Sequence, residues 1–329
     1  MMTLHANPVY GQTRNKATNK LKIFSGTANP QLAANICSYL GTDLGPIDIT
    51  HFPDGETFVK IKDSVRGEDC FIIQSISGKP NDMLMELLIM IDAMVRSSAA
   101  RITAVLPIYG YARQDRKDQP RVPITAKLVA NLLVAAGVDR VLTMDLHAAQ
   151  IVGFFDIPVD HLHASPVIVR YLRDKKLDNL VVVAPDTGSV KTAYSYSRIF
   201  KCGLAITAKQ RKGAEEVEAY SLVGDVDGRD VVMIDDLTST CGTIASAAEL
   251  VKQHGARNIY AAVTHGLLSE KGLERLCNSE ISELIVTDTV PQAKYDDSMP
   301  ITVLSVAELF GEAIRRIHNN QSVSSLFRM

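Results

Sequence analysis

The sequence predicts an α/β fold in which mainly parallel sheets are covered by helices on both faces. Apolar segments typical of buried strands alternate with segments of helical periodicity along almost all of the 329 residues, and this alternation is typical of parallel sheets. Polar residues follow several of the strands directly. Because ligands bind beyond the carboxyl ends of the strands in such sheets, we expect a site at this edge.

Nine segments have the composition of strands. Each is a short apolar run bounded by polar residues, as expected of a strand that is buried on both faces. In chain order these segments are 22–25, 70–75, 102–107, 140–145, 180–184, 231–235, 259–264, 284–287 and 302–305. The polar residues at their carboxyl ends are Asp145 and His147, Asp186, Asp235 and Asp236, and His265.

Helical periodicity is clearest at residues 83–95, 126–136 and 243–254. The first of these is the most apolar run of the chain, but it carries Glu86 and Asp92 and has one amphipathic face, which favours a core-facing helix over a membrane span. In the last, the apolar residues at helical spacing are Ile244, Ala247, Ala248 and Val251, and Gly255 stands just past the end of the helix.

The length suggests two domains or one large one. Two halves of similar strand and helix content meet near residues 157–166, so we expect an N-terminal domain over 21–163 and a C-terminal domain over 164–303. The segment 304–329 is expected to pack back on the first domain. Residues 1–20 lack acidic residues, as transit peptides do, but they have one Arg and no amphipathic pattern, which favours a short disordered tail.

The composition is that of a soluble globular protein, with 46% apolar and 22% charged residues. The net charge of −2 provides no strong field for nucleic acid or a membrane surface, so we expect neither as a partner. The five cysteines are widely spaced and show no metal-ligand spacing. An odd number of scattered cysteines fits a reducing cytoplasm.

The segment 231–243 is the most informative in the chain. A buried strand precedes Asp235 and Asp236, and a loop of small hydroxyl residues with one glycine leads into the next helix. The N-terminus of a helix offers N–H groups that bind phosphate. Carboxylates at a strand end are suited to sugar hydroxyls or a hydrated metal. From spacing alone, an ordinary strand–turn–helix unit remains the alternative.

Residues 109–124 form a basic loop after a predicted strand. Its cations, Arg113, Arg116, Lys117 and Arg121, suit charge-assisted bonds with a polyphosphate, although a solvated charged loop has the same composition. The basic segment 209–212, Lys-Gln-Arg-Lys, follows the apolar run 204–208. The next residues, Gly-Ala-Glu-Glu at 213–216, predict a mobile loop, although an ordinary solvated loop has the same composition. The segment 51–56 predicts a turn.

Two further polar positions are weak signals by themselves. Asp145 and His147 stand two residues apart at a strand end, so alternation places them on the same side. A metal site and a hydrogen-bonded structural pair both account for them. Asp186 follows a predicted strand at a turn into a helix, where Asp is also a common N-cap.

Together these segments resemble ribose-phosphate pyrophosphokinases, and the loop at 235–243 resembles the phosphate loop that phosphoribosyltransferases share with them. The resemblance runs in order from about residue 21 to 327. It rests on Phe-Pro-Asp-Gly-Glu at 52–56, Ser-Val-Arg-Gly-Glu-Asp at 64–69, the helix at 84–93, Tyr-Ala-Arg-Gln-Asp-Arg-Lys at 111–117, Ala-Lys-Leu-Val-Ala-Asn at 126–131, Asp-Leu-His-Ala at 145–148, Phe-Phe-Asp-Ile-Pro-Val-Asp at 154–160, Val-Gly-Asp-Val at 223–226 and Ser-Val-Ser-Ser-Leu-Phe at 322–327.

The resemblance implies two similar phosphoribosyltransferase-type domains. It also implies transfer of the β,γ-diphosphoryl group of ATP to the anomeric hydroxyl of ribose 5-phosphate, which yields 5-phospho-α-D-ribose 1-diphosphate and AMP. The implied cofactor is Mg²⁺, and inorganic phosphate and ADP are the implied regulators. The family commonly forms homo-oligomers, often hexamers, in the cytoplasm.

The resemblance also assigns site residues. Asp54, Gly55 and Glu56 would reach the adenine of ATP in a neighbouring subunit, and Arg113 and Gln114 would contact ATP in their own. His147 and Asp186 match magnesium positions, and Lys209 and Arg211 match the catalytic loop. The positions that match the ribose 5-phosphate site are Asp235, Asp236, Ser239, Thr240, Cys241, Gly242 and Thr243.

The sequence differs from the usual family pattern in three places. Ser239 stands in place of Asp, and Ser189 in place of a second Gly. In the catalytic loop, Gln210 stands in place of an Arg and Glu215 in place of an Asn further downstream, so this third difference involves two residues. These differences leave open a weakly active or regulatory paralogue that binds nucleotide or active subunits. A phosphoribosyltransferase is a third hypothesis; it accounts for residues 235–243 but not for Arg113 or Asp54.

Overall fold

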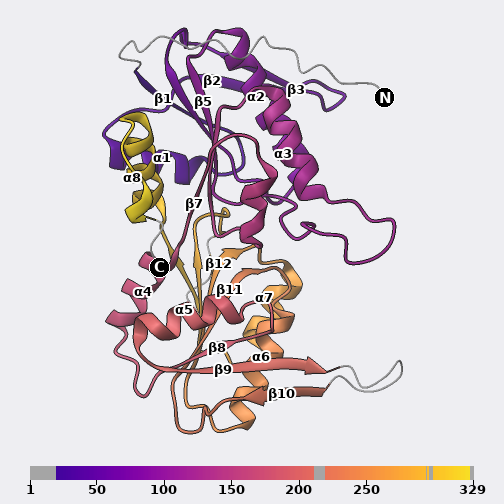
Figure 1. Cartoon of the computed structure of the whole chain (residues 1–329), viewed down its shortest axis with the longest axis vertical. Coiled ribbons are helices and arrows are strands. Elements are labelled where there is room, and N and C mark those ends of the chain that lie inside the picture. The colour runs from indigo at the N-terminus through magenta and orange to yellow at the C-terminus, as the bar shows by residue number, and fades with distance from the viewer. Residues whose placement is uncertain (1–19, 211–218, 294, 296–298, 327–329) are drawn as a thin grey trace.

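Two α/β lobes are stacked along the long axis of the molecule (Figure 1), as the computed structural model of the chain shows. The structure describes residues 20–210, 219–293, 295 and 299–326, with the side chains of residues 209–210 and 219–220 outside that description. Both lobes contain a mainly parallel sheet flanked by helices, which confirms the predicted fold class. The predicted tail at 1–20 lies almost entirely outside the described residues.

A five-stranded sheet forms the N-terminal lobe, and all of its neighbouring strands are parallel. The interior strand β4 is buried at every position because it has a strand on each side and helices on both faces. The strand order is β1 (Leu21–Ser25), β4 (Asp69–Ile73), β5 (Arg101–Leu106), β6 (Arg140–Met144) and β7 (Val159–Leu162). The helices of this lobe are α1 (Pro30–Leu40), α2 (Pro80–Arg96), α3 (Thr125–Ala136) and the short 3₁₀ helix η2 (Ala149–Phe154).

A separate antiparallel hairpin consists of β2 (Ile47–His51) and β3 (Thr57–Ile61). The turn predicted at 51–56 is confirmed, since residues 52–56 connect these two strands. The sequence did not predict the strands themselves. The reason is physical, because every residue of both strands is at least partly exposed and neither has the apolar run of a buried strand.

A seven-stranded sheet forms the C-terminal lobe. Its strand order is β10 (Ala219–Val223), β9 (Gly203–Gln210), β8 (Val181–Ala184), β11 (Val231–Thr238), β12 (Ile259–Gly266), β13 (Glu283–Thr287) and β14 (Ile301–Leu304). The edge pair β9–β10 is antiparallel, and the remaining described pairs are parallel. Its helices are α4 (Ser165–Asp174), α5 (Val190–Phe200), α6 (Gly242–Gln253) and α7 (Glu270–Cys277).

Several boundaries differ from the sequence prediction. The polar stretch at 157–166 contains β7, which pairs with β6. Lys209, which the resemblance assigns to the catalytic loop, belongs with Gln210 to β9, where both pair with β10. The mobile loop predicted at 213–216 lies outside the described residues. The strand β11 continues to Thr238 rather than ending at Asp235, because its last residues pair with β12, which is itself longer than predicted.

The helices at 83–95 and 243–254 are confirmed. In α6 the buried residues are the four at helical spacing, Ile244, Ala247, Ala248 and Val251. Gly255 follows with a φ of +89°, a conformation that glycine adopts without strain. The helix α2 buries one face against the sheet. Among the described residues, no helix combines the length and the apolar character that a bilayer crossing requires.

The C-terminal segment returns to the N-terminal lobe. After β14, the helix α8 (Ala307–His318) lies beside α1 (Figure 1), and the 3₁₀ helix η3 (Ser324–Leu326) follows. Phe310 and Ile314 are fully buried, together with Leu32 and Ile36 of α1. One hydrophobic cluster therefore contains residues of both lobes.

Candidate functional site

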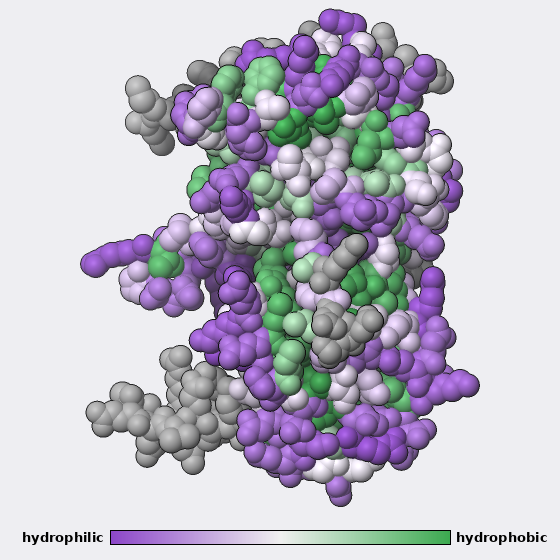
Figure 2. Space-filling model, turned by 180° about the vertical axis from the view of Figure 1, so that it is seen from behind, coloured by the Kyte–Doolittle hydropathy of each residue, from purple (hydrophilic) through white to green (hydrophobic). Residues whose placement is uncertain are grey.

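A cleft of about 1140 Å³ lies between the two lobes. One wall consists of the loop before α3 and the residues that follow β6, and the other of the carboxyl edge of the C-terminal sheet with the start of α5. The loop before α3 projects from the body of the molecule (Figure 1), and Figure 2 shows it as a mostly hydrophilic arm at mid-height.

The C-terminal wall of this cleft is a topological switch point. The strands β8 and β11 are parallel neighbours, but the chain passes from β8 to β9 on one side before it returns to β11 on the other. The connections at the carboxyl ends of such a pair diverge and leave a crevice between them. Asp186 follows β8, and Asp235 and Asp236 lie near the end of β11, so all three carboxylates face one crevice.

The cleft brings together predicted residues from three different groups. They are Arg113 and Gln114, predicted to bind ATP; His147 and Asp186, predicted to bind metal; and Asp235, Asp236 and Thr243, predicted to bind ribose 5-phosphate. A second cleft of about 980 Å³ is lined by Thr240, Gly242 and Thr243, and also by Asp186. The loop at 239–243 therefore separates two clefts.

Other predicted residues do not line either cleft. Asp54, Gly55 and Glu56 are exposed at the tip of the β2–β3 hairpin. Lys117 and Arg121 also lie outside the walls, although Arg116 belongs to them. The backbone of Lys209 is in β9, and Arg211 lies outside the described residues.

Ser239 and Cys241 take part in the loop at 239–243 by their backbone. The Cys241 side chain is 1% exposed and packs in the core of the C-terminal lobe, so its thiol cannot face a ligand in the cleft. Cys241 is the N-cap residue of α6 with a φ of +52°, and no side chain caps this end of the helix. The N–H groups at the start of α6 are thus left for a ligand or for solvent.

His147 contacts one of the two adjacent carboxylates, that of Asp236, across the cleft. Its Nδ1 atom lies 2.8 Å from Oδ2 of Asp236. The hydrogen bond to Asp236 raises the pKa of His147, with burial opposing it and the negative charges of Asp236, Asp115 and Asp235 adding to it. The residue predicted to lie near the metal is therefore bonded to a residue predicted to lie near the sugar.

The two adjacent carboxylates have different environments. Burial raises the pKa of Asp235, and the negative charges of Asp236 and Asp186 raise it further. Burial also acts on Asp236, but the hydrogen bond and charge of His147 outweigh it and lower the pKa of Asp236. Three neighbouring carboxylates, one of which has a raised pKa, are typical of a functional site.

Asp186 is held by the start of α5. Its Oδ1 atom accepts hydrogen bonds from the backbone N–H groups of Gly188 and Ser189, at 2.8 and 3.0 Å. The Ser189 hydroxyl also lies 3.3 Å from the same oxygen. These three contacts fix the carboxylate through its Oδ1 atom.

Asp145 and His147 do not form the structural pair that their spacing suggested. Asp145 lies past the end of β6 with a φ of +36°, so strand alternation no longer applies to it. Its oxygens contact Nδ1 of His163 at 2.8 Å, the backbone N–H of Ala164 at 3.0 Å and the hydroxyl of Thr264 at 2.7 Å. Although burial raises the pKa of Asp145, the His163 contact and the other two bonds lower it overall.

Asp145, His161 and His163 have ligand atoms within 4.8 Å of one another, a group that sequence reasoning missed. Two His at alternate positions, His161 in β7 and His163 directly after it, were the available signal. Burial lowers the pKa of His161 to about 4, so the ring is neutral, and its Nε2 accepts the Leu146 N–H at 2.9 Å. The ring proton then sits on Nδ1, which leaves no free lone pair for a metal. We assign this group to hydrogen bonding.

His265 was expected after a strand end, at the site. It lies instead within β12 and is 3% exposed, because β12 extends to Gly266. Its Nδ1 contacts the Thr289 hydroxyl at 2.9 Å, and its Nε2 contacts the carbonyl oxygens of Met144 and Asp145. His265 therefore helps to hold the backbone at the end of β6 and the start of the loop that follows it.

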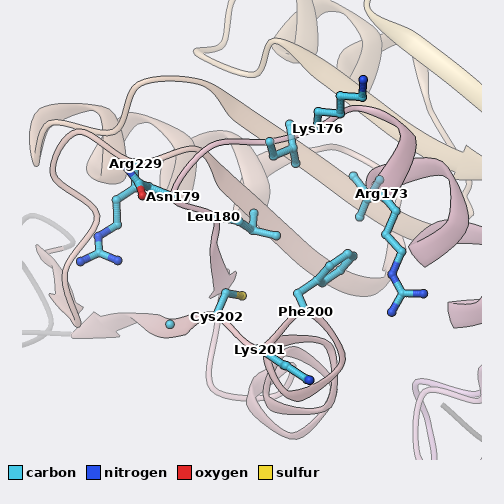
Figure 3. A pocket seen from close by; sticks show the side chains of 11 residues that line it. Arg173, Lys176, Asn179, Leu180, Phe200, Lys201, Cys202 and Arg229 are labelled. Atoms are coloured by element: carbon cyan, nitrogen blue, oxygen red, sulfur yellow. The ribbon is translucent and has the colours of Figure 1, made fainter.

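A third pocket, of about 560 Å³, lies at the opposite ends of the C-terminal strands (Figure 3). Leu180 and Phe200 face its interior, whereas the charged groups of Arg173, Lys176 and Arg229 point in different directions. No predicted site residue lines it, and its charges do not converge on a common ligand position.

Sequence profiles match both halves of the chain. Residues 21–137 match the N-terminal domain of ribose phosphate pyrophosphokinase, and residues 211–328 match the phosphoribosyl synthetase-associated domain.

Full-length relatives are also similar. The chain is 52% identical to ribose-phosphate pyrophosphokinase of Caldanaerobacter subterraneus, over 94% of this chain and 98% of that one. It is 52% identical to that of Chlorobaculum tepidum, over 93% and 95%. The phosphoribosylpyrophosphate synthetase of Mycobacterium smegmatis, known from a crystal structure, superposes with a TM-score of 0.87 at 41% identity, over 92% of this chain and 100% of that one.

Proposed function

The chain belongs to the ribose-phosphate pyrophosphokinase family, and we propose that the cleft between its lobes is where it carries out the family's reaction. The reaction transfers the β,γ-diphosphoryl group of ATP to the anomeric hydroxyl of ribose 5-phosphate. The products are 5-phospho-α-D-ribose 1-diphosphate and AMP. The observation that carries the proposal is the convergence of the cations, carboxylates and phosphate loop on one switch-point crevice.

The two walls of the cleft supply different groups. Arg113 and Gln114 on the N-terminal wall are suited to the phosphates of ATP, because an Arg guanidinium matches phosphate geometry. Asp235 and Asp236 on the opposite wall would accept hydrogen bonds from ribose hydroxyls, with the 5-phosphate at the loop 239–243. The anomeric hydroxyl and the β-phosphorus would then face each other across the cleft.

The transfer itself breaks the bond between the β-phosphorus and the oxygen that bridges it to the α-phosphorus. A bond forms between the anomeric oxygen and the β-phosphorus, the hydroxyl proton is lost to solvent or a base, and AMP leaves. Such transfers depend on positioning and on neutralising charge more than on covalent catalysis. Lys209 and Arg211 are the proposed cations for the transferring group.

The donor set fits Mg²⁺. Asp186, Asp235 and Asp236 provide oxygen ligands, which this ion prefers. Burial raises the pKa of Asp235, and the negative charges of Asp236 and Asp186 raise it further. A divalent cation beside these carboxylates would relieve that repulsion. We propose that Asp186 and His147 hold the ion, directly or through its waters, and that when bound it neutralises charge on the diphosphoryl group.

We also propose a homo-oligomer, with a hexamer as the expected form. The hairpin tip that carries Asp54 and Glu56 is exposed and does not line the cleft of its own subunit. Phe52 and Phe58 on the same hairpin are about half exposed, at 51% and 45%, as residues of an interface would be in an isolated subunit. Figure 2 also shows apolar side chains gathered near the centre of one face.

We also propose a compartment and two regulators for the protein. All five cysteines are free thiols, which supports the cytoplasm as the compartment. Inorganic phosphate and ADP are proposed as regulators on the basis of the family.

The proposal is tested by incubating the purified chain with Mg-ATP and ribose 5-phosphate. We expect AMP and the sugar diphosphate in equal amounts, with neither formed when Mg²⁺ is chelated. Formation of ADP instead would indicate single-phosphoryl transfer, and no nucleotide product would favour the regulatory paralogue. Either result contradicts the proposal.

A further inference from the structure

The phosphate loop at 239–243 is held from behind by one segment. The N–H of Leu267 donates to the Thr238 carbonyl at 2.8 Å. The Ser239 carbonyl accepts from both the N–H and the hydroxyl of Ser269, at 3.0 and 3.1 Å. The Thr240 carbonyl accepts from Nη1 of Arg275, in the last turn of α7, at 3.2 Å. Three successive carbonyls, that of the last residue of β11 and those of the first two loop residues, are thus directed at residues 267–275.

This arrangement determines where the loop's donors point. In a trans peptide the N–H of each residue is antiparallel to the preceding carbonyl. The N–H groups of 239, 240 and 241 therefore point away from α7. Within the described part of the chain, none of them donates to another backbone or side-chain group. The loop presents a row of unused donors on the side opposite its supports.

Arg275 also brings an unpaired charge to the loop. Its carbonyl contact is neutral, and no carboxylate among the described residues forms an ion pair with it. The guanidinium lies over the first residue of α6, since a Cβ added to Gly242 would be 3.0 Å from Nη1. It lines the 980 Å³ cleft beside Thr240 and Thr243. A guanidinium with spare donors next to unused backbone N–H groups is suited to a phosphate monoester.

We propose that Arg275 is a positioning residue of the ribose 5-phosphate site, which orients the phosphate loop through the Thr240 carbonyl and supplies positive charge for the 5-phosphate. This inference rests on the proposed function for the identity of the ligand. Neither Arg275 nor α7 belongs to the loop motif, so the assignment comes from the contacts alone. The competing explanation is that Arg275 only stabilises the C-terminal end of α7 through the helix dipole.

Arg173 provides a matched control for that explanation. It also lies in the last turn of a helix, α4, and it forms no ion pair within the described residues. It lines the pocket at the far end of the sheet (Figure 3), away from the phosphate loop. If only the helix dipole matters, Arg173→Ala and Arg275→Ala should have similar consequences.

The test compares Arg275→Ala, Arg275→Lys and Arg173→Ala in the full chain. Ribose 5-phosphate binding is measured by calorimetry without ATP, and KM values for both substrates and the melting temperature are measured in parallel. We expect Arg275→Ala to weaken ribose 5-phosphate binding at least tenfold while the KM for ATP stays within twofold. Arg275→Lys should restore part of the loss because it keeps the charge, and Arg173→Ala should change neither constant.

Two results would overturn the inference. One is ribose 5-phosphate binding by Arg275→Ala within twofold of the wild type. The other is equal weakening for both substrates together with a lower melting temperature, which a purely structural role produces. If the wild-type chain binds ribose 5-phosphate but forms no AMP, the proposed function fails and the calorimetric comparison still decides the role of Arg275. If the wild type binds no ribose 5-phosphate, the inference fails as well.

Discussion

The Nδ1 atom of His147 lies 2.8 Å from Oδ2 of Asp236, although the two residues are 89 positions apart. His147 belongs to the loop that follows β6 of the N-terminal sheet, and Asp236 to β11, which ends just before the loop at 239–243. The contact therefore links the walls of the cleft. Any movement of one lobe relative to the other would change the surroundings of Asp236 and of the neighbouring Asp235.

Ser239→Asp should leave ribose 5-phosphate affinity within about tenfold of wild type, a window of about 1.4 kcal/mol. The loop's contribution to phosphate binding comes from backbone N–H groups and the start of α6, and Ser239 contributes its carbonyl to the support. The added carboxylate should raise turnover or tighten the magnesium requirement. Loss of ribose 5-phosphate binding in calorimetry would mean that the loop is built differently from the family's.

Gly272→Ala should raise the KM for ribose 5-phosphate several-fold. A Cβ at this position would lie 2.4 Å from the Ser239 carbonyl oxygen, so the loop or α7 must move apart. Alanine is favoured over glycine in a helix by about 1 kcal/mol, so a loss cannot come from helix propensity. Gly153→Ala, where the added Cβ meets no atom within 4 Å, is the control. Equal KM values for the two variants would contradict the prediction.

Mixing two impaired variants should restore activity if the adenine site is shared between subunits. Lys209→Ala alone should lower turnover by on the order of a hundredfold. The double variant Asp54→Ala, Glu56→Ala should raise the KM for ATP. Mixtures of the two variants that are refolded together should recover a substantial share of wild-type turnover. In a mixed oligomer, some sites would combine an intact Lys209 from one variant with an intact Asp54 and Glu56 from the other. Activity no greater than the sum of the separate variants would argue against a shared site.

Asp230→Asn should destabilise the chain most at neutral pH. Asp230 is 3% exposed and accepts two hydrogen bonds from Arg257, at 2.9 and 2.8 Å, and one from Asn258 at 2.8 Å. The bond from Arg257 is the main cause that lowers the pKa of Asp230. A hydrogen bond to a charged group contributes about 1.5–3 kcal/mol, which is the loss we expect at pH 7.

The direction of the pH dependence follows from the lowered pKa. The stabilisation is present above the ordinary carboxyl pKa of about 3.9 and is lost as the pH falls through the lower folded value. Urea unfolding at pH 7 and pH 3 should show the gap between wild type and Asp230→Asn narrowing at the lower pH. A gap that is the same at both pH values would show that the carboxylate charge does not contribute. The exposed Asp225, changed to Asn, should alter stability little.

Much of the fold could be predicted because its strands are buried on both faces. Apolar runs such as 231–235 can be recognised as buried strands from their composition alone, and helical spacing predicts which face of α6 is buried. The hairpin β2–β3 and the strand β10 lack that signal, because edge and surface strands need no apolar run. Strand ends were misplaced where pairing with a neighbour, rather than composition, extends the strand, as in β11 and β12.

The candidate site was partly predictable for a related reason. Carboxylates at strand ends, such as Asp186, are placed by topology alone once the sheet is known. Arg275 could not be found in this way, because its partner is a backbone carbonyl 35 residues away and no spacing encodes that contact. Asp145 was misjudged because its positive φ turns the side chain out of the strand's alternation.

The packing of α8 on α1 has a consequence for synthesis of the chain. The residues of α8 that complete the N-terminal lobe leave the ribosome only after the entire C-terminal lobe. Until then, the apolar surface that Phe310 and Ile314 will cover is open to water and to other nascent chains. A polypeptide released before α8 is made would therefore carry an intact second lobe beside an unfinished first one, and such truncated products should be the ones that chaperones retain.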